Sequence, residues 1–103
     1  MSEELQKLHA MEQSINAHAM QRQHIHAQLL ETKSALTELK NTKKSYKIIS
    51  NIMVEQDAQE LTNNLKDKEE RLSARLESVK KQEVGLREEA EKLQKKLVAS
   101  EEQ

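Results

Sequence analysis

Apolar residues recur along two long stretches of the chain, at alternating steps of three and four. The rows of the first stretch are Leu8, Ile15, Arg22, Leu29, Leu36 and Met11, His18, Ile25, Thr32, Leu39. The rows of the second stretch are Leu65, Leu72, Val79, Leu86, Leu93 and Leu76, Ala90, Leu97, with Thr62, Glu69 and Glu83 completing the latter. Such spacing places a narrow seam on a helix and is typical of a coiled coil. We therefore predict long helices over residues 1–44 and 57–100, joined by a hairpin over residues 45–56.

The hairpin is predicted because residues 46–55 follow a different pattern. Two short runs of mainly apolar and β-branched side chains flank the polar pair Ser50-Asn51. This arrangement favours two antiparallel strands joined by a two-residue turn. Pairing about that turn sets Ile49 opposite Ile52, and the residue numbers of every pair then sum to 101. Directly after the hairpin, Asp57 followed by Glu60 predicts the capped start of the second helix.

The same sum relates the seam rows of the two helices. Most of the layers that it predicts are apolar, among them Ile15 with Leu86, Leu29 with Leu72 and Leu36 with Leu65, and two are polar, His18 with Glu83 and Thr32 with Glu69. A slip of a few residues would set leucines against charges. We infer a mainly α fold in which two long helices form an antiparallel coiled coil around one central β-hairpin.

Composition agrees with a helical hairpin and not with a globular domain. The chain has 103 residues, of which one is aromatic and 22 are Leu, Ile or Val. These are few large apolar side chains for a globular core. With no proline and one glycine, little interrupts a helix. The net charge of −1 gives no overall attraction for nucleic acid or for an anionic membrane. No signal peptide or membrane span is evident, and there is no cysteine, so the cytoplasm is the expected location.

Both faces of the predicted hairpin are apolar. One face carries Tyr46, Ile48 and Met53, and the other carries Ile49, Ile52 and Val54. An isolated two-stranded hairpin is marginal in water and leaves two strand edges unpaired. We expect hairpins of several chains to join into a shared sheet or barrel through these six oligomerisation residues. The alternative is a single hairpin folded back on its own coil.

The helix ends far from the hairpin are the least restrained part of the predicted coil. Their apolar side chains are candidate contacts for other proteins: Leu5, Leu8, Met11, Leu86, Leu93, Leu97 and Val98. A flexible apolar surface that contains methionine suits weak binding to varied partners. The alternative is that these are ordinary seam residues at frayed helix ends.

The sequence offers little for catalysis or for metal binding. Of the four histidines, His24 and His26 lie two residues apart and therefore on different faces of a helix, which does not suit a shared ion. There is no glycine-rich phosphate loop and no nucleophile elbow, and a two-stranded coil has no interior in which to tune a catalytic group. We expect neither an enzyme nor a protein that needs a cofactor.

The hairpin sequence, Tyr-Lys-Ile-Ile-Ser-Asn-Ile-Met-Val from Tyr46 to Val54, resembles that of prefoldin β subunits, particularly of the archaeal type. Asp57 with Glu60-Leu61 and the segment Lys81-Gln82-Glu83 are similar to the family too. The likeness covers nearly the whole chain in layout, as long helix, hairpin, long helix. Ser50 departs from the family, which usually has glycine there, and serine fits the positive φ of a tight turn less well.

This resemblance implies a hexamer of two α and four β subunits whose hairpins form a double β-barrel. Six coiled coils would hang from it and hold unfolded proteins at their tips, without ATP, before passing them to a group II chaperonin. The six hairpin residues would then serve assembly, and Leu5, Leu8, Leu93 and Leu97 would contact client proteins. The alternative function is a structural or tethering coiled coil that docks one defined partner.

Overall fold

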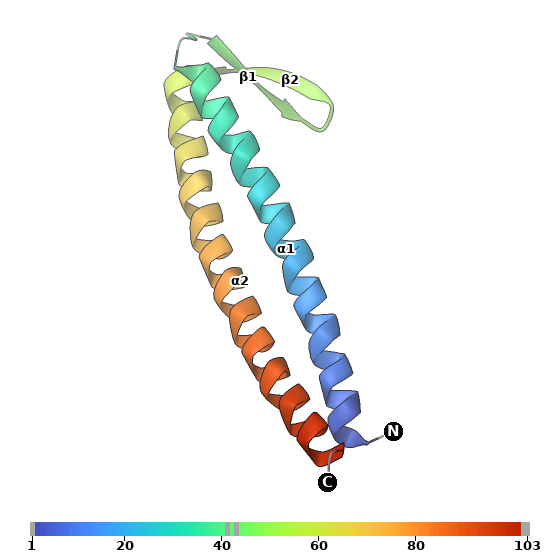
Figure 1. Ribbon diagram of the computed structural model, residues 1–103. Coiled ribbons are helices and arrows are strands. Elements are labelled where there is room, and N and C mark those ends of the chain that lie inside the picture. The colour runs from blue at the N-terminus through green and yellow to red at the C-terminus, as the bar shows by residue number, and fades with distance from the viewer. Residues whose placement is uncertain (1, 41, 43, 102–103) are drawn as a thin grey trace. The chain divides into compact units, whose positions relative to one another are not determined.

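The computed structural model describes residues 2–40, 42 and 44–101. Helix α1 (Glu3–Leu39) leads into strand β1 (Lys44–Ile49), which pairs with β2 (Ile52–Asp57), and helix α2 (Ala58–Glu101) follows directly (Figure 1). The predicted fold class, two long helices around one antiparallel hairpin, is confirmed. By its internal contacts the chain divides into two units, residues 2–24 with 76–101, and residues 25–75.

Helix α1 begins at Glu3 and ends earlier than predicted. The backbone N–H of Leu5 donates to Ser2 Oγ over 3.1 Å, which caps the first turn. The helix ends at Leu39 and not at residue 44. A short turn takes over there, in which the Lys40 N–H donates to the Thr37 carbonyl over 3.3 Å and Thr42 Oγ1 donates to the Glu38 carbonyl over 2.9 Å. Because these bonds satisfy the last helical carbonyls, the chain can leave the helix before strand pairing begins.

Asp57 connects the hairpin to the second helix without a loop. It is the last residue of β2, where it pairs with Lys44, and its Oδ2 accepts a hydrogen bond from the Glu60 backbone N–H over 3.3 Å. That contact satisfies one of the free N–H groups of the first turn of α2, as the sequence predicts. The strand therefore passes directly into the helix.

The hairpin register is the predicted one. The pairs run from Ile49 with Ile52 at the turn to Lys44 with Asp57 at the open end, so the residue numbers of all six pairs sum to 101. The turn contains two residues with positive φ, Ser50 at 47° and Asn51 at 70°, which is the backbone of a type I′ turn. Ser50 thus adopts the left-handed conformation although it carries a Cβ.

Burial confirms the two seams of the coil in both units. All 21 residues predicted to lie in the seams are buried or half-buried. In the unit of residues 2–24 and 76–101, the buried positions include Ile15 and Val79; in the unit of residues 25–75, they include Ile25, Leu29 and Leu72. Figure 1 shows α1 and α2 side by side and antiparallel within each unit. The apolar spacing of the sequence therefore identifies the inner face of each helix.

Replacing Ser50 with glycine should stabilise the hairpin by about 0.5–1 kcal/mol. Glycine removes the Cβ penalty of the left-handed region, about 1–2 kcal/mol, and gives back part of that gain through its greater freedom in the unfolded chain. Amide hydrogen exchange at Ile49 and Ile52 should slow by about 2–5-fold. Ser50→Ala is the matched control, because alanine keeps the Cβ; equal slowing in both variants would contradict the assignment of strain to Ser50.

Candidate functional site

A buried carboxylate joins the helices in the unit of residues 2–24 and 76–101. Glu83 is 6% exposed; it accepts a hydrogen bond from Arg22 Nε of α1 over 2.8 Å and one from Arg87 Nη2 of its own helix over 3.0 Å. The bond from Arg22, followed by that from Arg87, lowers the pKa of the Glu83 carboxyl below its ordinary value, against the opposing effect of burial. Stability from this cluster is therefore fully present above the ordinary glutamate pKa and is lost as the pH falls through the lowered one.

The partners of this polar cluster differ from the prediction. The sequence suggests that His18 faces Glu83, but His18 Nε2 lies 3.1 Å from Gln82 Oε1, and its Nδ1–H donates to the Ser14 carbonyl over 2.8 Å. Arg22, predicted to lie opposite Val79, reaches Glu83 instead. The physical reason is that the long guanidinium side chain spans the extra turn and forms a charge-assisted bond, which is stronger than a neutral one.

The hairpin surface, defined as Tyr46, Ile48, Ile49, Ile52, Met53 and Val54, is exposed on both faces. The exposed fractions of these six side chains range from 43% at Val54 to 71% at Ile48. The strand register pairs Ile48 with Met53 on one face of the hairpin and Ile49 with Ile52 on the other. The described part of the chain therefore covers neither face of its most apolar element.

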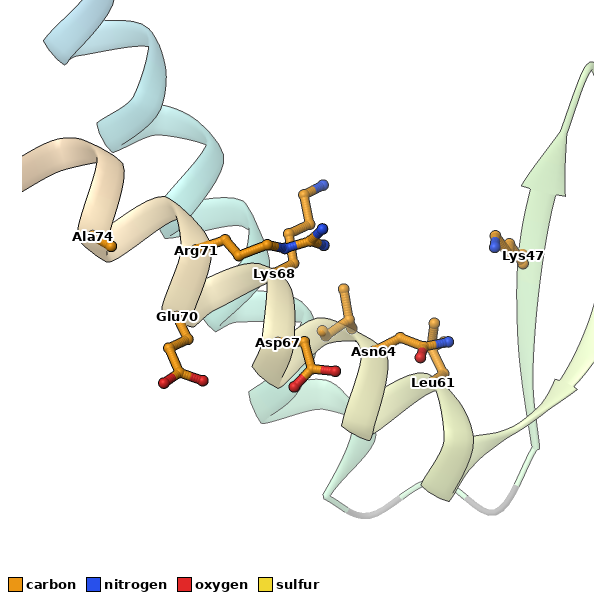
Figure 2. Close-up of a pocket in the computed structure, with 9 residues that line it drawn as sticks. Lys47, Leu61, Asn64, Asp67, Lys68, Glu70, Arg71 and Ala74 are labelled. Atoms are coloured by element: carbon orange, nitrogen blue, oxygen red, sulfur yellow. The ribbon is translucent and has the colours of Figure 1, made fainter.

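An open groove separates one face of the hairpin from α2. Its walls are Lys47 of β1 and a row of α2 residues: Leu61, Asn64, Leu65, Asp67, Lys68, Glu70, Arg71 and Ala74. Figure 2 shows Lys47 on the strand, across the groove from Asn64 and Leu61 on the helix. Lys47 belongs to the hairpin face of Ile49, Ile52 and Val54, because alternate residues of a strand point to the same side. That face looks into a groove that the described residues leave open.

The predicted contacts at the helix tips fall into two groups. Leu5 and Val98 are 43% and 48% exposed, as expected for positions beside the seam. The others, Leu8, Met11, Leu86, Leu93 and Leu97, are half-buried. At this end, Lys96 of α2 forms an ion pair with Glu4 of α1 at 3.5 Å. The tip thus combines two exposed apolar side chains with a seam that is only partly closed.

Three further apolar side chains are exposed and were not singled out in the sequence. Met20 is 72% exposed, and Leu30 and Val84 are each 55% exposed. All three lie on the outer sides of their helices, one or two positions away from a seam residue. The sequence could have indicated them, because each is an apolar residue at a helix position where the seam spacing predicts a polar one. Singly exposed apolar residues of this kind are common on protein surfaces.

Two further features are absent from the part of the chain that the structure describes. Neither α1 nor α2 contains a stretch that is long and apolar enough to cross a membrane. Within the same residues, no three His, Cys, Asp or Glu side chains are placed so that they could hold a metal ion together.

The sequence matches known proteins along nearly its full length. The family described as "Prefoldin subunit" matches residues 2–101. The chain belongs to the prefoldin family.

Two archaeal relatives illustrate how this prefoldin chain compares with other members. It is 31% identical to the prefoldin subunit beta of Methanosarcina acetivorans over 97 residues, which cover 91% of this chain and 83% of the relative. It is likewise 31% identical to the prefoldin subunit beta of Archaeoglobus fulgidus over 94 residues, covering 88% and 81%. The resemblance to archaeal β subunits that the hairpin sequence indicates is therefore confirmed over most of the chain.

The fold of this prefoldin chain matches a solved structure as well. The crystal structure of the prefoldin beta subunit from Thermococcus strain KS-1 superposes with a TM-score of 0.85 at 26% identity, covering 94% of this chain and 88% of that one. Membership of the prefoldin family implies a chaperone role and assembly with other prefoldin subunits.

Proposed function

We propose that this prefoldin chain is the β-type subunit of a hexameric chaperone that holds unfolded proteins without ATP. Two α-type subunits and four copies of this chain join through their hairpins into a shared β-barrel. The coiled coils hold non-native clients at their tips and pass them to a group II chaperonin in the cytoplasm. Family membership supports this proposal, and the exposure of the hairpin surface is the observation that carries it.

The hairpin surface supports assembly because its burial is worth a free energy comparable to the cost of association. Each of its six side chains is about half exposed, and full burial of one large apolar side chain is worth about 1.5–3 kcal/mol. The six together could contribute on the order of 5–10 kcal/mol. Association costs an estimated ~4–15 kcal/mol, so burial of all six side chains on both faces is about the same size as this cost. A closed ring of hairpins adds strand pairing at the open edges, which favours association further.

The strand edges favour the same arrangement. The sheet contains only β1 and β2, so each strand has one paired side and one open side among the described residues. Open edges are templates for further strands, and a closed barrel removes them. Shared strand pairing therefore satisfies the backbone while the apolar faces become buried.

The tips support client capture through weak and repeated contacts. Leu5 and Val98 offer exposed apolar area beside half-buried seam residues, which suits partners of many sequences. One such contact binds weakly, but several arms on one assembly raise the effective concentration of the others and add avidity. A client is therefore held by the whole assembly and released when a few contacts open.

Replacing Met53 with lysine should prevent assembly. The substitution places a charge in the proposed barrel interface, where its desolvation is uncompensated. Native mass spectrometry of the chain, expressed together with an α-type prefoldin subunit, should show the hexamer for the natural sequence and free chains for Met53→Lys.

Met20→Lys is the matched control for this experiment. Met20 is 72% exposed against 66% for Met53, but it belongs to the outer side of α1 and not to the hairpin. This variant should assemble normally. A normal hexamer with Met53→Lys, or an equal loss of assembly with Met20→Lys, would rule out the hairpin as the specific interface.

Replacing both Leu5 and Val98 with serine should weaken client capture and leave assembly intact. Each truncation removes roughly 1 kcal/mol of apolar contact with a bound client and the two together roughly 2 kcal/mol, so about 30-fold more complex should be needed for half-suppression of aggregation. The measurement is light scattering from a denatured enzyme as it is diluted into buffer that contains the complex. The double variant Met20→Ser with Leu30→Ser is the control, since these side chains are also apolar and exposed but are not among the proposed tip contacts. Unchanged suppression by the tip variant would refute the assignment of the tips.

A further inference from the structure

A groove between the two helices lies within the client-binding tip. Its lining consists of Lys7 and Met11 from α1, and Glu89, Lys92, Leu93 and Lys96 from α2. Met11 and Leu93 are seam residues and are half-buried, so they form an apolar floor. The three lysines are exposed, and their apolar stems can extend this floor while their ammonium groups stay in water. The groove therefore joins an apolar floor to a rim that is mostly basic.

The side chains that line this groove carry a net positive charge, while Glu3 and Glu88 lie one helical turn before Lys7 and Lys92 on the same helices. Three lysines and one glutamate line it. Glu4 lies beside it and pairs with Lys96 at 3.5 Å, which neutralises one cation in part. The neighbouring Glu91 is engaged by Lys95 at 3.2 Å, outside the groove lining. Lys7 and Lys92, one on each helix, take part in none of the ion pairs found among the described residues. They flank the apolar floor from opposite helices.

We propose that the tip groove selects apolar client segments flanked by acidic side chains over the same segments flanked by basic ones. This inference rests on the proposed holdase function and specifies its substrate class. The floor of Met11 and Leu93 binds apolar side chains of many shapes, since methionine adapts to its partner. Lys7 and Lys92 then attract a carboxylate on either side of the bound segment and repel a cation. Such exposed charges act mainly on selectivity and on the rate of encounter.

Two peptides test this selectivity on the complex assembled with an α-type subunit. They share one unstructured centre of leucine and valine, carry a fluorescent label, and differ only in flanks of aspartate and glutamate or of lysine and arginine. Fluorescence anisotropy should show about 3–10-fold tighter binding of the acidic peptide at about 50 mM salt. The preference should fall toward one at about 500 mM salt, because exposed charges are screened.

Variants localise the effect to this groove. Lys7→Glu with Lys92→Glu should abolish or reverse the preference, and Lys7→Gln with Lys92→Gln should reduce it without adding negative charge. The control, Lys80→Glu with Lys81→Glu, changes the net charge of the chain equally at exposed positions outside the groove and should keep the preference. Circular dichroism and native mass spectrometry establish that each variant is folded and assembled.

The outcomes separate this inference from the function on which it rests. Equal binding of the two peptides, preference for the basic one, or an acidic preference that survives in both groove variants would overturn the proposed selectivity and leave the holdase function standing. Failure of both peptides to bind the natural complex would overturn the holdase function itself.

Discussion

The structure depends on one constraint. The described part of the chain neither buries the apolar faces of the hairpin nor pairs its open strand edges. Six apolar side chains occupy both of its faces, and its two strands pair only with each other among the described residues. Water cannot replace the missing apolar contacts. A helical coil could bury one face of such a ribbon, but in this chain an open groove separates that face from α2. The proposed assembly with further hairpins would cover the apolar faces and pair the open strand edges.

The coil obeys a related constraint, since a narrow seam leaves little room for error in register. The hairpin fixes where α2 starts, because Asp57 ends β2 and caps α2 with no loop between them. In the unit of residues 2–24 and 76–101, Arg22 and Glu83 add a specific polar contact that a shifted register would break. A buried carboxylate without its arginines is costly, so an alignment of the helices that separates Arg22 from Glu83 is disfavoured.

Much of the fold could be predicted because it follows from local rules. Every residue that the steps of three and four place in a seam is buried or half-buried, and the pair Ser50-Asn51 fixes the turn and with it the register of the strands. The predicted end of α1 was wrong by five residues. The helix ends where hydrogen bonds from Lys40 and Thr42 satisfy its last carbonyls, and composition does not reveal these bonds. The predicted partner of Glu83, His18, was also wrong, because pairing residues by position ignores the length of the Arg22 side chain. The basic rim of the tip groove was missed, since Lys7 and Lys92 converge only when two distant segments pack together.

Hydrogen exchange at the open edges of the hairpin tests the central claim most directly. In an antiparallel ladder that closes with Ile49 opposite Ile52, the N–H groups of Tyr46, Ile48, Met53 and Glu55 point outward, away from the partner strand. If hairpins of several chains share one barrel, these amides should exchange at least about 100-fold more slowly in the assembled complex than in the separate chain. Equally fast exchange in a complex that is fully folded and assembled would show that the chains are joined elsewhere, and a barrel of shared hairpins would be ruled out.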